Sequence, residues 1–252
     1  MGSLFDLTGQ VAFLTGASRG LGRAMAAGLA QAGADVVVTS RKLDDVAAVA
    51  RELAAGGRKV LPLALEVTRA ADVEAAVHEA VAQMGRIDIL VNNAGINIRK
   101  PVLELTEDDW DQTLDTNLKG AFLVARAVGR QMLGQGSGSV INIASMMASV
   151  VHAERAAYAS SKAGVVQLTR VLAVEWAPHV RVNAICPGPF LTELNRPILD
   201  DAEKVKYFTD RLPMKRFGEP EELVGSVIFL ASAASSYMTG TTLYIDGGWT
   251  AL

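Results

Sequence analysis

Short runs of aliphatic and β-branched residues recur along the chain, separated by longer segments that mix alanine with charged residues. Each run has five to seven residues, as in "VAFLT" and "DVVVTS", and is rich in Val, Ile and Leu. Runs of this length and composition are typical of strands that are buried on both faces of a sheet. The sequence predicts seven such strands, over residues 11–15, 35–40, 59–65, 87–91, 139–144, 180–185 and 241–246.

The segments between the predicted strands are amphipathic and long enough to be crossover helices. They cover residues 21–32, 43–55, 70–84, 107–133 and 157–177. Strands that alternate with helices predict an α/β fold, with a parallel sheet covered by helices on both faces. The long interruption at about 187–218 is expected to form a lid over the substrate, because long irregular connections in compact domains are usually functional.

Composition narrows the possible partners and the compartment. A chain of 252 residues, half of them hydrophobic, predicts one domain over 1–252. The net charge of -3 provides no basic surface for nucleic acid, and no stretch approaches the eighteen apolar residues of a membrane span. A single cysteine, Cys186, and the lack of a leader-like start at residue 1 favour a cytoplasmic protein. No ligand spacing suggests a metal site, so none is expected.

Three glycines follow the first predicted strand directly. Gly16, Gly20 and Gly22 lie in "TGASRGLG", with the spacing G-x-x-x-G-x-G, and a predicted helix begins there. Glycines at such a turn let the backbone approach a pyrophosphate held at the N-terminus of the helix. Turn glycines are common, so the alternative is an ordinary turn; the strand-to-helix context favours a dinucleotide site.

Together with five other motifs, this loop makes the chain resemble the short-chain dehydrogenase/reductase family over nearly its whole length. The other motifs are "NNAG" (92–95), Asn117 in "DTNLKG", Ser145 after "INIA", Tyr158 and Lys162 in "YASSK", and "PGP" (187–189) followed by Thr192. The resemblance implies a doubly wound, Rossmann-type sheet of seven strands in the order 3-2-1-4-5-6-7. It also implies an NAD(P)-dependent enzyme that acts on CH–OH groups and assembles as a homotetramer.

The resemblance assigns four catalytic residues: Asn117, Ser145, Tyr158 and Lys162. Tyr158 and Lys162 are four positions apart and share one face of a helix, so the ammonium is expected to favour the phenolate form of the tyrosine, the general acid/base. Ser145 would bond the reacting oxygen, and Asn117 would hold a water near Lys162. The alternative for Tyr158 and Lys162 is an exposed pair on a helix surface.

Charges after the second predicted strand indicate the cofactor. Ser40 stands where an NAD site usually has a carboxylate, and Arg41 follows it; together with Arg19 in the glycine loop it predicts a preference for NADP. An ordinary loop charge is the alternative for Arg41. The residues that the resemblance assigns to cofactor binding are Gly16, Ser18, Arg19, Gly20, Leu21, Gly22, Ser40, Arg41, Glu66, Val67, Asn93, Ala94, Gly95, Tyr158, Lys162, Pro187, Gly188 and Thr192.

Within the family, "GINIRKPVLELTEDDWDQTLDTNL" and "PGPFLTEL" are most similar to gluconate 5-dehydrogenases and neighbouring sugar-acid or polyol dehydrogenases. The small-molecule substrate is then expected to contact Arg99, Met147, His152 and Arg155, although rim charges or core packing are alternatives for these residues. The competing activities are a 3-oxoacyl-[acyl-carrier-protein] reductase or another carbonyl reductase. Val174 stands where the former enzymes usually have arginine. A non-catalytic dinucleotide-binding protein is a third possibility.

Overall fold

The computed structural model describes residues 4–251 of the chain. Its strands are β1 (Val11–Leu14), β2 (Asp35–Ser40), β3 (Val60–Ala64), β4 (Ile89–Asn92), β5 (Gly138–Ile143), β6 (Val180–Pro187) and β7 (Thr242–Ile245). Within the described residues these strands form one parallel sheet in the order β3-β2-β1-β4-β5-β6-β7. The predicted strands, and the strand order implied by the resemblance, are confirmed.

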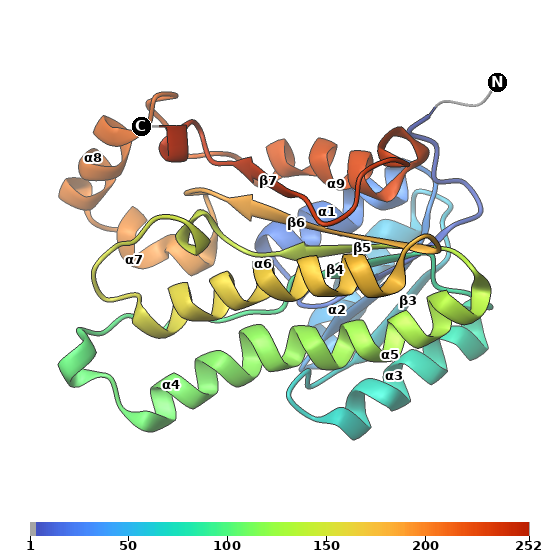
Figure 1. Cartoon of the computed structure of the whole chain (residues 1–252). Helices are drawn as coiled ribbons and strands as arrows, with labels where there is room; N and C mark the ends of the chain where they lie inside the picture. The colour runs from blue at the N-terminus through green and yellow to red at the C-terminus, as the bar shows by residue number, and fades with distance from the viewer. Residues whose placement is uncertain (1–3, 252) are drawn as a thin grey trace.

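Helices cover both faces of this sheet (Figure 1). They are α1 (Gly20–Gln31), α2 (Leu43–Ala54), α3 (Ala70–Met84), α4 (Glu107–Leu114), α5 (Gly120–Gln135), α6 (Ala156–Trp176), α7 (Arg196–Leu199), α8 (Ala202–Arg211) and α9 (Val224–Ala231). Helices α1, α2 and α9 pack on one face, and α3, α5 and α6 pack on the other. The alternating pattern predicts this covering of both faces, and the resemblance implies the doubly wound fold; both are confirmed.

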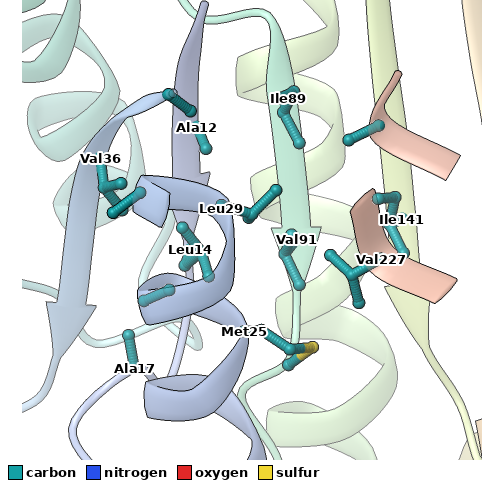
Figure 2. Packing of buried hydrophobic residues seen from close by; sticks show 14 of the residues in the cluster. Ala12, Leu14, Ala17, Met25, Leu29, Val36, Ile89, Val91, Ile141 and Val227 are labelled. Carbon is teal, nitrogen blue, oxygen red and sulfur yellow. The ribbon is translucent and has the colours of Figure 1, made fainter. Parts of the chain in front are cut away.

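Alternate residues of each strand supply the two layers of the core. On β1, Ala12 and Leu14 face α1 and α9, where Leu29 and Val227 complete the cluster drawn in Figure 2. Phe13 points to the opposite face, into the cluster formed with α3, α5 and α6. Because both faces of the central strands are buried, both sets of side chains must be apolar. This burial explains why the strands read as continuous hydrophobic runs.

Three parts of the chain differ from the pattern-based expectation. The predicted helix over 107–133 is divided into α4 and α5 by a π-helical turn at Asp115–Lys119. Helix α9 was not predicted, because "VGSVIFLA" lacks the polar face that marks a surface helix. The interval 187–218 contains α7 and α8, which lie beyond the carboxyl end of β6 (Figure 1). No helix in residues 4–251 is both long enough and apolar enough to span a bilayer.

Candidate active site

A cavity of about 120 Å³ opens at the carboxyl ends of the central strands. Its walls come from the glycine loop after β1, from the segments after β4 and β5, from α6, and from the chain after β6. Because parallel strands end at one edge of the sheet, residues far apart in sequence meet there, which is the usual ligand position in doubly wound folds. This cavity brings together Ser145, Tyr158 and Lys162.

The glycine loop is shaped for close approach of a dinucleotide backbone. Gly16 has a positive φ of 64°, which side-chain-bearing residues rarely adopt. A Cβ on Gly22 would lie 2.1 Å from the carbonyl oxygen of Gly16, so the turn closes only with glycine there. The Asn93 side chain fixes this turn, since its Nδ2 donates to the Gly16 oxygen at 2.9 Å. The free backbone at the start of α1 therefore fits a pyrophosphate.

The other residues that the resemblance assigns to the cofactor follow the same edge. Leu21, Asn93, Gly95, Pro187, Gly188 and Thr192 line the cavity. The amide of Ala94 donates to the Thr15 hydroxyl at 3.0 Å, which fixes the segment after β4 to the glycine loop. Glu66 accepts from the Thr68 hydroxyl at 3.0 Å, directly before the buried Val67.

At the end of β2, the Ser40 hydroxyl donates to the backbone oxygen of Lys42 at 2.7 Å. Among residues 4–251, no partner forms a hydrogen bond or ion pair with the exposed Arg41 side chain. Ser18 and Arg19 lie in the glycine loop, and the Arg19 guanidinium contacts Glu193. The two arginines that are expected to recognise a 2′-phosphate thus differ. Arg19 forms an ion pair with Glu193, whereas Arg41 has no side-chain partner among the described residues.

Burial raises the pKa of the Tyr158 hydroxyl, whereas a hydrogen bond with Ser145 and the positive charges of Arg99 and Arg155 lower it. Ser145 follows β5, and its hydroxyl also accepts from the amide of Met147 at 3.2 Å. Burial dominates, so Tyr158 stays a phenol at neutral pH. Such a group is a proton donor for an oxygen that develops negative charge.

Lys162 lies one helical turn after Tyr158 on α6, with its ammonium near the tyrosine ring. Its ammonium lies 5.8 Å from the centroid of the Tyr158 ring and donates to the backbone oxygen of Ile143 at 2.8 Å. Burial lowers the pKa of Lys162 to about 8. Arg99 and Arg155 are the positive charges that lower the pKa of Tyr158, and the expected effect of Lys162 on this pKa stays a prediction.

Asn117 lies in the π-helical turn between α4 and α5. Its Oδ1 accepts from the amide of Ile96 at 2.8 Å, and its Nδ2 donates to the Ser161 hydroxyl at 3.0 Å. A Cβ on Gly95 would lie 3.1 Å from Asn117 Oδ1 and 3.5 Å from Lys162 Nζ, so these two side chains border the same glycine. π-Helical turns often occur at functional sites, and this one fixes the segment that follows "NNAG" against α6.

Two guanidinium groups give the cavity a positive charge. Arg155 is only 7% exposed, at the N-cap of α6, and Arg99 projects from the segment after β4. Burial and the charge of Arg99 lower the pKa of Arg155, while the exposed Glu154 carboxylate, 3.9 Å away, raises it. Within the described residues, the cavity lining contains no Asp or Glu. This arrangement favours an anionic ligand, whose charge would offset both cations.

The substrate residues expected from the sequence are only partly assembled. Arg99, Met147 and Arg155 line the cavity, but His152 does not. The His152 ring instead stacks on Phe208, with centroids 5.6 Å apart and planes 11° apart. Phe208 belongs to α8 and is itself part of the lining. His152 therefore packs against a lining residue, Phe208, and its direct contact with the substrate stays a prediction.

Sequence reasoning did not name Asn97, Asn195 or Phe208, all of which line the cavity. Asn195 and the backbone oxygen of Leu194 accept hydrogen bonds from Arg99 Nη2, at 3.2 and 2.9 Å. Of these three residues, only Asn97 had a local signal in the sequence, because it lies two positions from Arg99, which was expected to contact the substrate. Asn195 and Phe208 reach the cavity only because the chain after β6 folds back across it.

Comparisons with known proteins agree with this geometry. A family model described as enoyl-(acyl carrier protein) reductase matches residues 16–250. The chain is 41% identical to 2-dehydro-3-deoxy-D-gluconate 5-dehydrogenase of Escherichia coli K12, over 99% of this chain and 98% of that protein. It is 39% identical to the NAD-dependent glycerol dehydrogenase of Listeria innocua, over 98% and 96% of the two chains.

Among solved structures, a gluconate 5-dehydrogenase from Burkholderia cenocepacia in complex with NADP and tartrate superimposes with a TM-score of 0.96. The two proteins are 42% identical, and the match covers 98% of each chain. The similarity therefore extends over the whole fold, including the segment after β6 that lines the cavity, and is not limited to the dinucleotide-binding half.

Proposed function

Because this chain belongs to the short-chain dehydrogenase/reductase family, we propose that it uses NADP(H) to interconvert a hydroxyl and a ketone on a sugar acid. The substrate pair would be gluconate and its 5-keto form, or a close relative of them. One observation carries this choice: the buried Arg155 and the half-buried Arg99 line the cavity that holds Ser145 and Tyr158, and the lining contains no Asp or Glu among residues 4–251.

The proposed chemistry divides the reaction between a hydride and a proton. A bound nicotinamide supplies the hydride for reduction and accepts it in oxidation. Tyr158 donates its phenolic proton to the carbonyl oxygen during reduction, and takes the hydroxyl proton back during oxidation. Ser145 donates a hydrogen bond to the same oxygen and so stabilises the charge that develops on it. Lys162 would bind the nicotinamide ribose, and Asn117 would hold a water beside it.

The arginines would hold the substrate by its carboxylate. Arg155 stands at the N-terminus of α6, where a cation is disfavoured and an anion is stabilised by the helix dipole. A carboxylate bound there would pair with Arg155 and Arg99 together. Anchoring one end of a flexible chain selects the carbon that reaches Tyr158 and Ser145. The distance from the arginines to the phenol would therefore determine which hydroxyl reacts.

The experiment that tests this proposal is a substrate panel assayed with NADP(H) and NAD(H). We expect 5-ketogluconate to be reduced efficiently and neutral ketones or polyols to react more slowly, because the neutral compounds offer no carboxylate to the two arginines. Glycerol serves as the neutral polyol in this panel, because the relative from Listeria innocua is named a glycerol dehydrogenase. Efficient reduction of acetoacetyl thioesters with no reaction of 5-ketogluconate would contradict the sugar-acid proposal and favour a 3-oxoacyl-[acyl-carrier-protein] reductase. Tight cofactor binding without any turnover would instead indicate a non-catalytic protein.

The cofactor preference gives a separate prediction. We expect the wild type to bind NADP about tenfold more tightly than NAD, because a charge-assisted hydrogen bond from the exposed Arg41 contributes about 1.5 kcal/mol. The double variant Ser40→Asp/Arg41→Gln should reverse the preference, since the new carboxylate repels the 2′-phosphate and accepts the ribose hydroxyls. Dissociation constants from cofactor fluorescence provide the measurement. Equal affinities of the wild type for both cofactors would show that Arg41 does not recognise the phosphate.

We further propose that the protein is a cytoplasmic homotetramer. Apolar side chains are exposed on two helices of the same sheet face, namely Phe122 and Leu133 on α5 and Val171 and Val174 on α6. Exposed apolar residues that gather on one face are typical of subunit interfaces. We expect light scattering of the purified protein to give a mass close to four times the 26.6 kDa of one chain. A monomer mass at micromolar concentration would contradict the assembly.

A further inference from the structure

An ion pair connects the glycine loop to the chain after β6. The Arg19 guanidinium donates from Nη1 to Oε2 of Glu193 at 2.6 Å, although the two residues lie 174 positions apart. Glu193 begins the short helical turn that precedes α7. A Cβ on Gly20 would lie 3.6 Å from the Thr192 side chain, so the glycine loop also approaches that side chain at this point. The pair therefore lies across the groove in which the cofactor is proposed to bind.

Glu193 thus forms an ion pair with Arg19, one of the two arginines that the sequence leads us to expect at the 2′-phosphate of NADP. Arg41 has no such partner among residues 4–251. Both side chains of the Arg19–Glu193 pair are largely exposed, at 70% and 58%, so the pair is weak and can exchange partners. A phosphate that recruits Arg19 must displace this carboxylate, or must accept it as a negatively charged neighbour. NAD lacks this phosphate, so it can bind without displacing Glu193 from Arg19.

We propose that Glu193 determines cofactor selectivity by competing with the 2′-phosphate of NADP for Arg19, and so narrows the preference for NADP over NAD. The inference rests on the proposed NADP use. With NAD bound, the Arg19–Glu193 pair stays formed. With NADP bound, Arg19 pairs with the phosphate and the Glu193 carboxylate is solvated by water. The contribution of Glu193 to selectivity equals the strength of the exposed pair together with the repulsion between its carboxylate and the phosphate.

The test compares dissociation constants for NADP and NAD in the wild type, Glu193→Gln, Arg19→Gln and the double variant. Glu193→Gln should tighten NADP binding about two- to fivefold, the effect of losing one exposed ion pair, and leave NAD binding unchanged. In the Arg19→Gln background the same change should have a smaller effect on NADP, because only the repulsion between the carboxylate and the phosphate is then removed. The gain should also shrink at high salt, because exposed charges are screened. Asp200→Asn is the matched control, since Asp200 forms another exposed pair, with Arg196, in the same segment.

Two results would overturn the inference while leaving NADP use intact. If Glu193→Gln weakens both cofactors equally, the pair holds the segment after β6 over any dinucleotide. If Arg19→Gln weakens NADP but Glu193→Gln changes nothing, Glu193 does not compete. By contrast, if Arg19→Gln leaves NADP affinity unchanged, Arg19 does not bind the phosphate, and the inference fails together with that part of the proposed function.

Discussion

Replacing Tyr158 with phenylalanine should lower turnover about 10²- to 10⁴-fold, the usual loss when a general acid or base is removed, and should leave the fold and cofactor binding intact. The change deletes one hydroxyl and keeps the ring that packs near Lys162. The measurement is kcat for ketone reduction, together with the dissociation constant of the cofactor. Tyr237→Phe is the matched control, because the Tyr237 side chain is fully exposed. Near-wild-type turnover of Tyr158→Phe would show that another group transfers the proton.

The pH dependence follows from the protonation state of the same residue. Burial raises the pKa of Tyr158 above its ordinary value, so the phenol, which is the form needed for reduction, persists through neutral pH. Oxidation needs the phenolate and should become faster as pH rises towards this pKa. Reduction should stay constant over the same interval and fall only when pH passes the pKa. Rates measured in both directions between pH 6 and 10 test this, and an oxidation rate independent of pH would contradict it.

Replacing Arg155 with methionine should raise KM for an acid substrate by about 10- to 100-fold, because a charge-assisted hydrogen bond contributes roughly 1.5–3 kcal/mol. We expect the rise of KM to be closer to 100-fold, since Arg155 is buried and its loss leaves the substrate carboxylate paired with Arg99 alone. KM for a neutral ketone should change little. Comparing the acid with the neutral ketone separates recognition of the carboxylate from a general loss of structure.

Two further variants complete this comparison. Arg155→Lys keeps the charge and should recover part of the affinity for the acid. Arg170→Met removes an exposed arginine from the same helix, one that donates only to Gln167 among the described residues, and should change neither KM. An equal rise of KM for acid and neutral substrates in Arg155→Met would contradict the anchoring role.

The charge of Arg155 also lowers the pKa of Tyr158. Its removal should therefore raise the pH at which the rate of reduction begins to fall.

Most of the fold could be predicted because its signals are local. Each strand is buried on both sides and reads as an apolar run, and each crossover helix shows its own amphipathic period. The exceptions have physical causes. Helix α9 is apolar throughout, so its period is hidden. The division between α4 and α5 depends on a π-helical turn that the hydrophobic pattern does not mark.

By itself, the sequence determined the parts of the site that depend on spacing along the chain. The three glycines follow a strand and open a helix, and Tyr158 and Lys162 share a helix face, because both relations are set by backbone geometry within a few residues. The placement of Ser145 after β5 follows similarly, since the carboxyl ends of parallel strands meet at one edge of the sheet.

Only the tertiary structure decided which distant side chains meet and which groups they engage. It brings Arg99 and Arg155 to one cavity, directs Lys162 to the Ile143 oxygen, and places His152 behind Phe208. It also pairs Arg19 with Glu193. The His152–Phe208 and Arg19–Glu193 contacts form because the chain after β6 folds back over the sheet edge. Residues that it joins across 174 positions share no local periodicity, so their pairing is fixed by the packing of the whole domain.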